Sequence, residues 1–217
     1  MPTIKVNNKI DVVLFDFGGV LAEEGWKQGL WAIAAANGLS GYHLMNAAAD
    51  AVYTTGYLLG KGSESRFWNA LRKKTGIKGD NASLNHEIIS RFILREWMIE
   101  FVKRLKAKNL TVGILSDQTD ILDKLNARFD FFKFFDHVFN SYHMGKCKRD
   151  ISLFDDIAQI LKTKPNRILF IDDDYGHVAR ARQKGWNAIQ YVERDSFCTE
   201  MEKILSIKCS ARNSKKD

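Results

Sequence analysis

The sequence predicts an α/β protein: a three-layer, Rossmann-like parallel sheet with an inserted α-helical cap domain. Two observations predict this fold. From residue 110 onward, short apolar runs alternate with helical segments, the pattern of a parallel sheet joined by right-handed crossovers. Before that point, residues 24–100 are almost wholly helical in pattern and separate one early apolar run from the others. A chain of 217 residues is long enough for one substantial core with such a smaller insertion.

The first apolar run, VVLF at residues 12–15, has the β-branched and aromatic content of a strand covered on both faces. Asp16 follows it directly. Because ligands of open α/β sheets bind at the carboxyl ends of the strands, Asp16 is a candidate site residue. Gly18 and Gly19 allow a sharp turn and a close approach of the backbone to a ligand. Taken alone, these residues fit an ordinary polar turn equally well.

The helical segment is predicted to form a cap over the same crevice. The predicted domains are an α/β core at residues 1–21 and 101–205, a helical cap at 22–100 and a flexible tail at 206–217. Large apolar residues at helical spacing usually serve the core of such a cap. Four cap aromatics are nevertheless candidates for lining a substrate pocket: Trp26, Trp31, Tyr53 and Tyr57.

The elements after the cap follow from the same signals. LTVGILS and ILFIDDD are apolar runs without alternation, as in buried strands, and the second ends in acids. The segments between strands space their apolar residues as helices do. Strands are predicted at residues 110–116, 137–140, 168–174 and 188–192, and helices at 121–129, 152–161 and 178–184.

Composition limits the classes of partner. No segment approaches the roughly eighteen consecutive apolar residues of a membrane span, and the N-terminus lacks the apolar region of a signal peptide, so a cytoplasmic location without membrane contact is expected. The net charge is +7, but the basic residues are spread along the chain, so nucleic acid is not the expected partner. Anionic small molecules explain the surplus equally well. Three cysteines without metal-like spacing are expected to be free thiols: Cys147, Cys198 and Cys209.

Polar side chains end three of the predicted strands, and these ends meet at one edge of a parallel sheet. The residues are Asp16, Ser116 with Asp117, and Asp172 with Asp173 and Asp174. Converging carboxylates repel one another unless a cation lies between them, and Mg²⁺ accepts such oxygen ligands while leaving positions for phosphate. Lys148, in the basic stretch GKCKRD, can add a fixed positive charge. Together these groups are what phosphoryl transfer through an aspartyl-phosphate requires.

These stretches resemble the motifs of the haloacid dehalogenase superfamily, in its branch with a helical cap inserted after the first motif (the C1 cap, subfamily IA). DFGGVL at residues 16–21 resembles the first motif, ILSD at 114–117 the second and GKCKRDISLF at 145–154 the third. FIDDDYGHVARARQKGWNAIQY at 170–191 is similar to the fourth motif with the following helix and strand, and GYLLGKGSESRFW at 56–68 resembles a cap helix. Four motifs in order are far more specific than any one of them.

The resemblance implies a role for each matching residue. Asp16 matches the nucleophile, which also ligates magnesium. Ser116 matches the hydroxyl that hydrogen-bonds the phosphoryl group, and Lys148 the lysine that neutralises nucleophile and phosphate. Asp172 and Asp173 match the acidic pair of the fourth motif and belong to the expected metal site, with Asp173 as the direct metal ligand and Asp172 as an outer partner. The carbonyl of Gly18 is a further expected metal ligand, and the expected substrate-binding residues are Ser116, Asp117, Lys148 and Gly19.

Gly18 departs from the family pattern, because phosphatases of the family usually have a second Asp there as general acid. The Gly18 carbonyl can still bind magnesium, but no side chain can protonate a leaving alkoxide, an effect commonly worth about 100- to 10,000-fold in rate. Dehalogenases of the family also lack this Asp and tend to carry an aromatic residue instead. Two further positions depart from the family pattern: Arg149 stands where the family frequently has Pro after the lysine, and Asp117 where it frequently has Asn after the serine. Both changes leave the reacting groups in place.

The resemblance therefore implies a Mg²⁺-dependent phosphatase that hydrolyses a small phosphomonoester, such as a sugar phosphate, as a monomer or homodimer. The expected partner is a small phosphorylated metabolite chosen by the cap. Two alternatives stay open. One is a weakly active or inactive relative that serves as a binding or regulatory protein, which Gly18 favours. The other is a 2-haloacid dehalogenase, which the acid pair disfavours. No substrate follows from the sequence, because the cap arrangement selects it.

Overall fold

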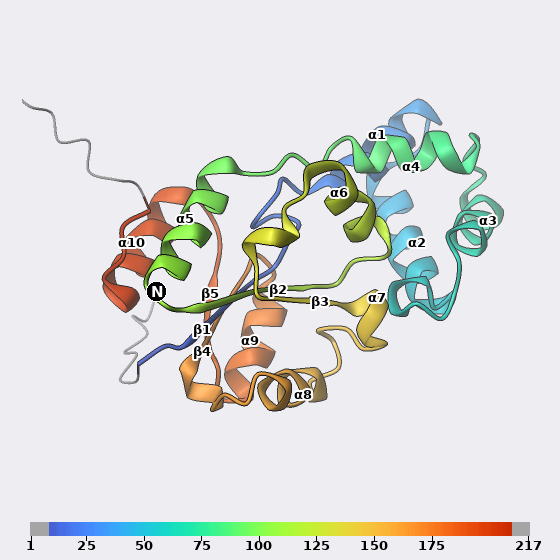
Figure 1. Cartoon of the computed structure of the whole chain (residues 1–217). Coiled ribbons are helices and arrows are strands. Elements are labelled where there is room, and N and C mark those ends of the chain that lie inside the picture. Colours follow the sequence, from blue (N-terminus) through green and yellow to red (C-terminus); the bar gives the residue numbers. More distant parts are fainter. Residues whose placement is uncertain (1–8, 210–217) are drawn as a thin grey trace, which may run out of the picture.

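A five-stranded parallel sheet lies at the centre of the computed structural model, which describes residues 9–209 (Figure 1). The strands lie side by side in the order β3-β2-β1-β4-β5. Their bounds are Val12–Phe15 (β1), Thr111–Ser116 (β2), His137–Asn140 (β3), Ile168–Asp172 (β4) and Asn187–Gln190 (β5). The strand order changes direction between β1 and β4, where ligands of such sheets bind. The predicted α/β fold is confirmed.

Helices cover both faces of the sheet, because its strands are apolar on both sides. Val13 and Phe15 share one hydrophobic cluster with α5 (Glu96–Ala107), α6 (Ile121–Phe129) and α10 (Arg194–Leu205). Val12 and Leu14 share the other with α8 (Ser152–Ile160) and α9 (Tyr175–Gln183). The short elements after α5 are the helix α7 (Ser141–Met144) and two 3-10 helices, Phe132–Phe134 and Pro165–Arg167. Within residues 9–209, no helix combines the length and apolarity needed to cross a membrane.

Four helices between β1 and α5 lie beyond the carboxyl ends of the strands (Figure 1). They are α1 (Gly25–Ala36), α2 (Gly41–Thr54), α3 (Glu64–Thr75) and α4 (Asn81–Ile89), with a 3-10 helix at Tyr57–Leu59. Helices α1 and α4 approach closely at Gly29, where a Cβ would lie only 2.6 Å from Cα of Ile88. The inserted helical domain expected from the sequence is therefore present.

The two segments that join this helical domain to the sheet run side by side. Ala22 and Leu94 form an antiparallel bridge there. Helix α5 begins at Glu96, contacts β2 and continues past residue 100, so the division predicted between residues 100 and 101 would cut this helix. We therefore propose that the cap spans residues 22–94 and that α5 belongs to the core.

The C-terminal segment contains a helix that the sequence analysis does not predict. Helix α10 buries Phe197 and Met201 in the core. Ser206 ends the helix in the left-handed conformation, with φ 56°. The chain then folds back, so that Ile207 and Cys209 are buried. Residues 206–209 of the predicted tail are thus packed, and residues 210–217 lie outside the described part of the chain.

This reversal pairs two of the cysteines. Cys198 of α10 forms a disulfide with Cys209, across a Cα–Cα distance of 5.4 Å. Cys147 is free and buried. The prediction of three free thiols is therefore wrong for Cys198 and Cys209, because their pairing depends on a turn that an odd cysteine count does not reveal.

Candidate active site

A cavity of about 480 Å³ lies at the carboxyl edge of the sheet, between the strand ends and the cap. Asp16 follows β1 and Ser116 ends β2, and both line the cavity. The register pairs Phe15 with Ile171, so the next residues, Asp16 and Asp172, are neighbours at the strand ends. The cap supplies the opposite wall with Trp26, Ala49, Val52, Tyr53 and Leu58.

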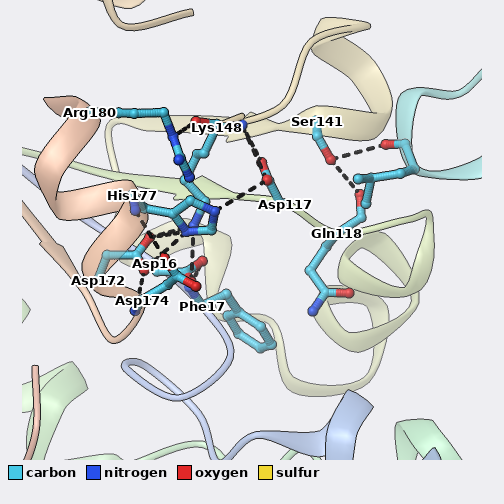
Figure 2. A network of polar contacts seen from close by, with 11 residues as sticks. Asp16, Phe17, Asp117, Gln118, Ser141, Lys148, Asp172, Asp174, His177 and Arg180 are labelled. Carbon is cyan, nitrogen blue, oxygen red and sulfur yellow. Dashed lines mark hydrogen bonds and ion pairs between the residues drawn. The ribbon is translucent and has the colours of Figure 1, made fainter. Parts of the chain in front are cut away.

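Lys148 is fully buried between two carboxylates (Figure 2). Its Nζ atom lies 3.0 Å from Oδ2 of Asp16 and 2.5 Å from Oδ2 of Asp172. Burial disfavours the charged form of Lys148, but the carboxylates of Asp16 and Asp172 outweigh it and raise the pKa of the ammonium. Lys148 therefore supplies a permanent positive charge beside Asp16.

The backbone of Lys148 is held from both sides (Figure 2). Its N–H donates to Oδ1 of Asp117 at 2.9 Å, and its carbonyl accepts from Nε of Arg180 at 2.7 Å. The sequence predicts Asp117 as a substrate-binding residue. The structure uses its carboxylate to position the Lys148 loop, and a substrate contact for Asp117 stays a prediction.

Asp172 has most of its acceptor positions occupied by protein groups. Its Oδ1 accepts the N–H of Asp174 at 2.8 Å and lies 3.2 Å from Nδ1 of His177, while Oδ2 accepts from Lys148. Burial favours the neutral form, yet Lys148 and His177 lower the pKa of Asp172 overall. These contacts suit a residue that orients Lys148 better than one that ligates a metal directly.

Three carboxylates could hold a metal ion. Oxygens of Asp16, Asp172 and Asp173 lie within 4.8 Å of one another. Burial raises the pKa of Asp16, and burial with the charges of Asp172 and Glu24 raises the pKa of Asp173 to about 6. One lysine cannot neutralise three acids, so negative charge is left over. A hard divalent cation such as Mg²⁺ fits this donor set, because it prefers oxygen ligands and needs only one or two carboxylates.

The two glycines after Asp16 lie in different surroundings. Gly19 has φ 79°, and a Cβ on it would lie 2.5 Å from Oδ2 of Asp173, so only glycine allows this approach. The structure thus places Gly19 against Asp173 rather than among the residues that line the cavity, and its predicted substrate contact stays untested. Gly18 does line the cavity.

The four candidate aromatics of the cap separate into two groups. Trp26 and Tyr53 line the cavity. Trp31 is 41% exposed and packs edge-on against Tyr42 on the surface. Tyr57 is buried, and its hydroxyl donates to Asp120. Two of the four therefore reach the place where a substrate would lie.

Several polar residues of the cavity wall are absent from the sequence-based site. They are Glu24, Gln118, His177 and Arg180, together with Arg149, whose guanidinium lies 4.2 Å from the ring centre of Tyr53. His177 and Arg180 could have been found, because they lie in the first turns of α9 after the acidic strand end. The predicted start of that helix, residue 178, lies three positions after the observed start at Tyr175. Glu24 resembles an ordinary helix cap in the sequence and carries no further signal.

Comparisons with known proteins agree with this arrangement. A family model for haloacid dehalogenase-like hydrolases matches residues 10–183. A HAD-like family hydrolase from Porphyromonas gingivalis has a TM-score of 0.72 at 22% identity, covering 93% of this chain and all of that one. A haloacid dehalogenase-family enzyme from Bacteroides thetaiotaomicron, solved with magnesium and inorganic phosphate, has a TM-score of 0.69 at 19% identity, covering 87% and 98%. At these identities the two structures show the shared fold.

Among curated sequences, bifunctional epoxide hydrolase 2 of Rattus norvegicus is 28% identical over 114 residues. That match covers 49% of this chain and 20% of the relative. Matches to the curated relatives cover only 20% to 29% of those proteins, so their whole length includes much that this chain does not match.

Proposed function

This chain belongs to the haloacid dehalogenase-like hydrolases, and from that premise we propose that it is a Mg²⁺-dependent phosphatase of a small phosphomonoester. The observation that carries the proposal is the surroundings of Asp16. Its carboxylate lies 3.0 Å from a buried lysine and within 4.8 Å of oxygens from two further acids. A site for a phosphate ester needs both positive and negative groups. The phosphate is a dianion, so a negatively charged nucleophile can approach it only if positive charge lies beside them.

Asp16 is the proposed nucleophile. One carboxylate oxygen is close to Lys148, and Oδ1 accepts the N–H of Phe17 at 2.7 Å, so the group is held in one orientation. The ammonium of Lys148 favours the ionised form of Asp16 and attracts the phosphoryl oxygens. Ser116, 2% exposed at the end of β2, can donate its hydroxyl proton to a phosphoryl oxygen.

Magnesium is the proposed cofactor, held by Asp16, Asp173 and the carbonyl of Gly18. When bound, it would neutralise the phosphate charge and polarise the phosphoryl group. The magnesium and phosphate in the Bacteroides thetaiotaomicron structure support this choice by likeness of fold. Asp172 stays an outer partner in this proposal, because its oxygens are already engaged by Lys148, Asp174 and His177.

Covalent transfer then proceeds in two steps through Asp16. An oxygen of Asp16 attacks phosphorus while the bond to the ester oxygen breaks, and the departing oxygen takes up a proton, which gives the alcohol and leaves an aspartyl-phosphate. Water next attacks the same phosphorus, and the bond to Asp16 breaks. Inorganic phosphate and the free carboxylate result. The cavity walls from the cap, including Trp26 and Tyr53, would select the alcohol part of the substrate.

The test is phosphate release from a panel of sugar phosphates and p-nitrophenyl phosphate, with magnesium or with EDTA. We expect turnover that needs magnesium and is lost in Asp16→Asn. The matched control is Asp50→Asn, an exposed acid of α2 that pairs with Lys74 and should leave turnover unchanged.

The same assay separates the alternatives. Halide release from a 2-haloacid in the presence of EDTA would replace the phosphatase by a dehalogenase. A folded protein without turnover on any ester or haloacid would favour a binding or regulatory role.

A further inference from the structure

Hydrolysis of an alkyl phosphate requires a proton donor for the departing ester oxygen, because an alkoxide is a poor leaving group. Gly18 has no side chain to supply this proton. Under the proposed phosphatase function, another group of the cavity must therefore supply it. The acids of the cavity wall are Asp16, Glu24, Asp117, Asp173 and Asp174.

Four of these acids already have other tasks. Asp16 is the proposed nucleophile and Asp173 a proposed metal ligand. Asp117 accepts the N–H of Lys148 through both carboxylate oxygens, at 2.9 and 3.1 Å. Asp174 caps α9 by accepting the N–H of His177 at 3.0 Å and is exposed. Glu24 is the remaining carboxylate of the wall.

Glu24 lies beside the empty position of Gly18. A Cβ built on Gly18 would lie 3.4 Å from Oε2 of Glu24 and 3.8 Å from Nε2 of Gln118. Oε1 of Glu24 has a different task, because it accepts the N–H of Lys27 at 3.2 Å and caps α1. One oxygen thus anchors the side chain, and the other lies in the corner of the cavity where a longer residue 18 would place its own polar group.

The backbone on either side of Glu24 is also held. The N–H of Glu23 donates to the carbonyl of Ile93 at 2.9 Å. Gly25 packs so tightly against Phe92 that a Cβ would lie 2.4 Å from the ring. Glu24 therefore enters the cavity from a fixed point at the start of the cap, as a catalytic group must.

We propose that Glu24 is the general acid of the reaction and takes the place of the side chain that Gly18 lacks. Its carboxyl O–H donates a proton to the ester oxygen as the bond from phosphorus to that oxygen breaks, giving the neutral alcohol and the Glu24 carboxylate. The carboxylate then accepts a proton from the water that attacks phosphorus, which regenerates the carboxyl group. The amide of Gln118, at the same corner, can orient the departing oxygen.

The test compares two esters that differ in their need for this proton. Glycerol phosphate releases an alkoxide, whereas p-nitrophenyl phosphate releases a stable anion. Glu24→Gln keeps an oxygen to cap α1 but has no proton to transfer. We expect kcat for glycerol phosphate to fall about 100- to 1,000-fold and kcat for p-nitrophenyl phosphate to fall less than about 3-fold. The control is Glu87→Gln, a half-buried cap glutamate outside the cavity wall that pairs with Arg91, and this change should alter kcat for neither ester.

A second variant restores an acid from the other side. Gly18 has no left-handed φ, and a Cβ on it meets nothing closer than 3.4 Å, so Gly18→Asp can be accommodated. When Gly18→Asp is added to Glu24→Gln, the double variant should have a kcat for glycerol phosphate at least about tenfold above that of Glu24→Gln alone.

The outcomes separate this role from the proposed function. Equal losses on both esters, no loss on either, or no recovery in the folded double variant would each overturn the role of Glu24. Absence of magnesium-dependent turnover of p-nitrophenyl phosphate by the unsubstituted protein would instead overturn the phosphatase function itself.

Discussion

Nζ of Lys148 lies 2.5 Å from Oδ2 of Asp172, and the two side chains are 1% and 0% exposed. Their opposite charges therefore neutralise each other where both side chains are almost wholly buried. Removing one partner of such a pair leaves an uncompensated charge in the interior, which costs far more than losing a surface pair. The chemistry of the site and the stability of the core therefore depend on the same contact.

Replacement of Lys148 by Met should destabilise the protein by about 3–5 kcal/mol, because Asp172 and Asp16 would lose their buried cation. Urea denaturation followed by circular dichroism measures this loss. Lys103→Met is the control, since Lys103 pairs with Glu100 at the surface, and it should cost less than about 1 kcal/mol. Equal losses in the two variants would show that Lys148 does not compensate buried charge.

Asp173 should make the metal-free protein more stable as the pH falls from about 6 towards about 4. Its pKa is about 6 in the folded state and about 3.9 in unfolded chains, so the folded state binds more protons between these values. Asp173→Asn removes a carboxylate that is partly buried beside other acids, and should stabilise the metal-free protein at pH 7.5 by about 1 kcal/mol, with less gain near pH 4.

Thermal unfolding of both proteins across that pH range, in EDTA, measures the effect. Magnesium should raise the melting temperature of the unsubstituted protein at pH 7.5 more than at pH 5, because protons compete for Asp173, and should raise that of Asp173→Asn little. An equal magnesium effect in both proteins would exclude Asp173 as a ligand.

Trp26 and Trp31 form a matched pair for the substrate wall, since both are cap tryptophans of α1. Trp26 lines the cavity and Trp31 is 41% exposed outside it. Trp26→Leu should raise KM for the best phosphate ester of the panel about 5- to 10-fold, through loss of one apolar contact. Trp31→Leu should change KM less than about 2-fold. If the two variants have the same KM, the cap wall does not contact the substrate.

The cysteine arrangement predicts a labelling pattern. One of the three cysteines is free and buried, and the other two form a disulfide. Protein purified without reductant should incorporate one alkyl group when unfolded, at Cys147, and three after reduction. Mass spectrometry counts these groups, and Cys147→Ser should reduce the first count to zero. Three groups without reduction would mean that Cys198 and Cys209 are not paired.

The strands and most of the core helices could be predicted from local signals. Apolar runs without alternation marked the buried strands, and helix 121–129 and strand 137–140 have the predicted bounds. Helix α10 was missed although Phe197, Met201, Ile204 and Leu205 are spaced as one apolar helical face, so the sequence does contain a signal for it. The predicted cap boundary lies within α5 because one helical pattern follows another there, whereas in the structure the Ala22–Leu94 bridge and the hydrogen bonds beside it mark where the chain returns.

The sequence by itself determined the class of fold and which polar residues lie at the strand ends, where the proposed reacting groups are, because strand burial and the meeting of parallel strand ends follow from local chemistry. Only the tertiary structure decided what surrounds those groups. Asp117 positions Lys148, Trp26 lines the cavity while Trp31 does not, and Glu24 lies beside Gly18. These contacts depend on how the cap and the loops pack against the sheet. Because the residues in contact are far apart in the chain, no local sequence pattern predicts how close they lie.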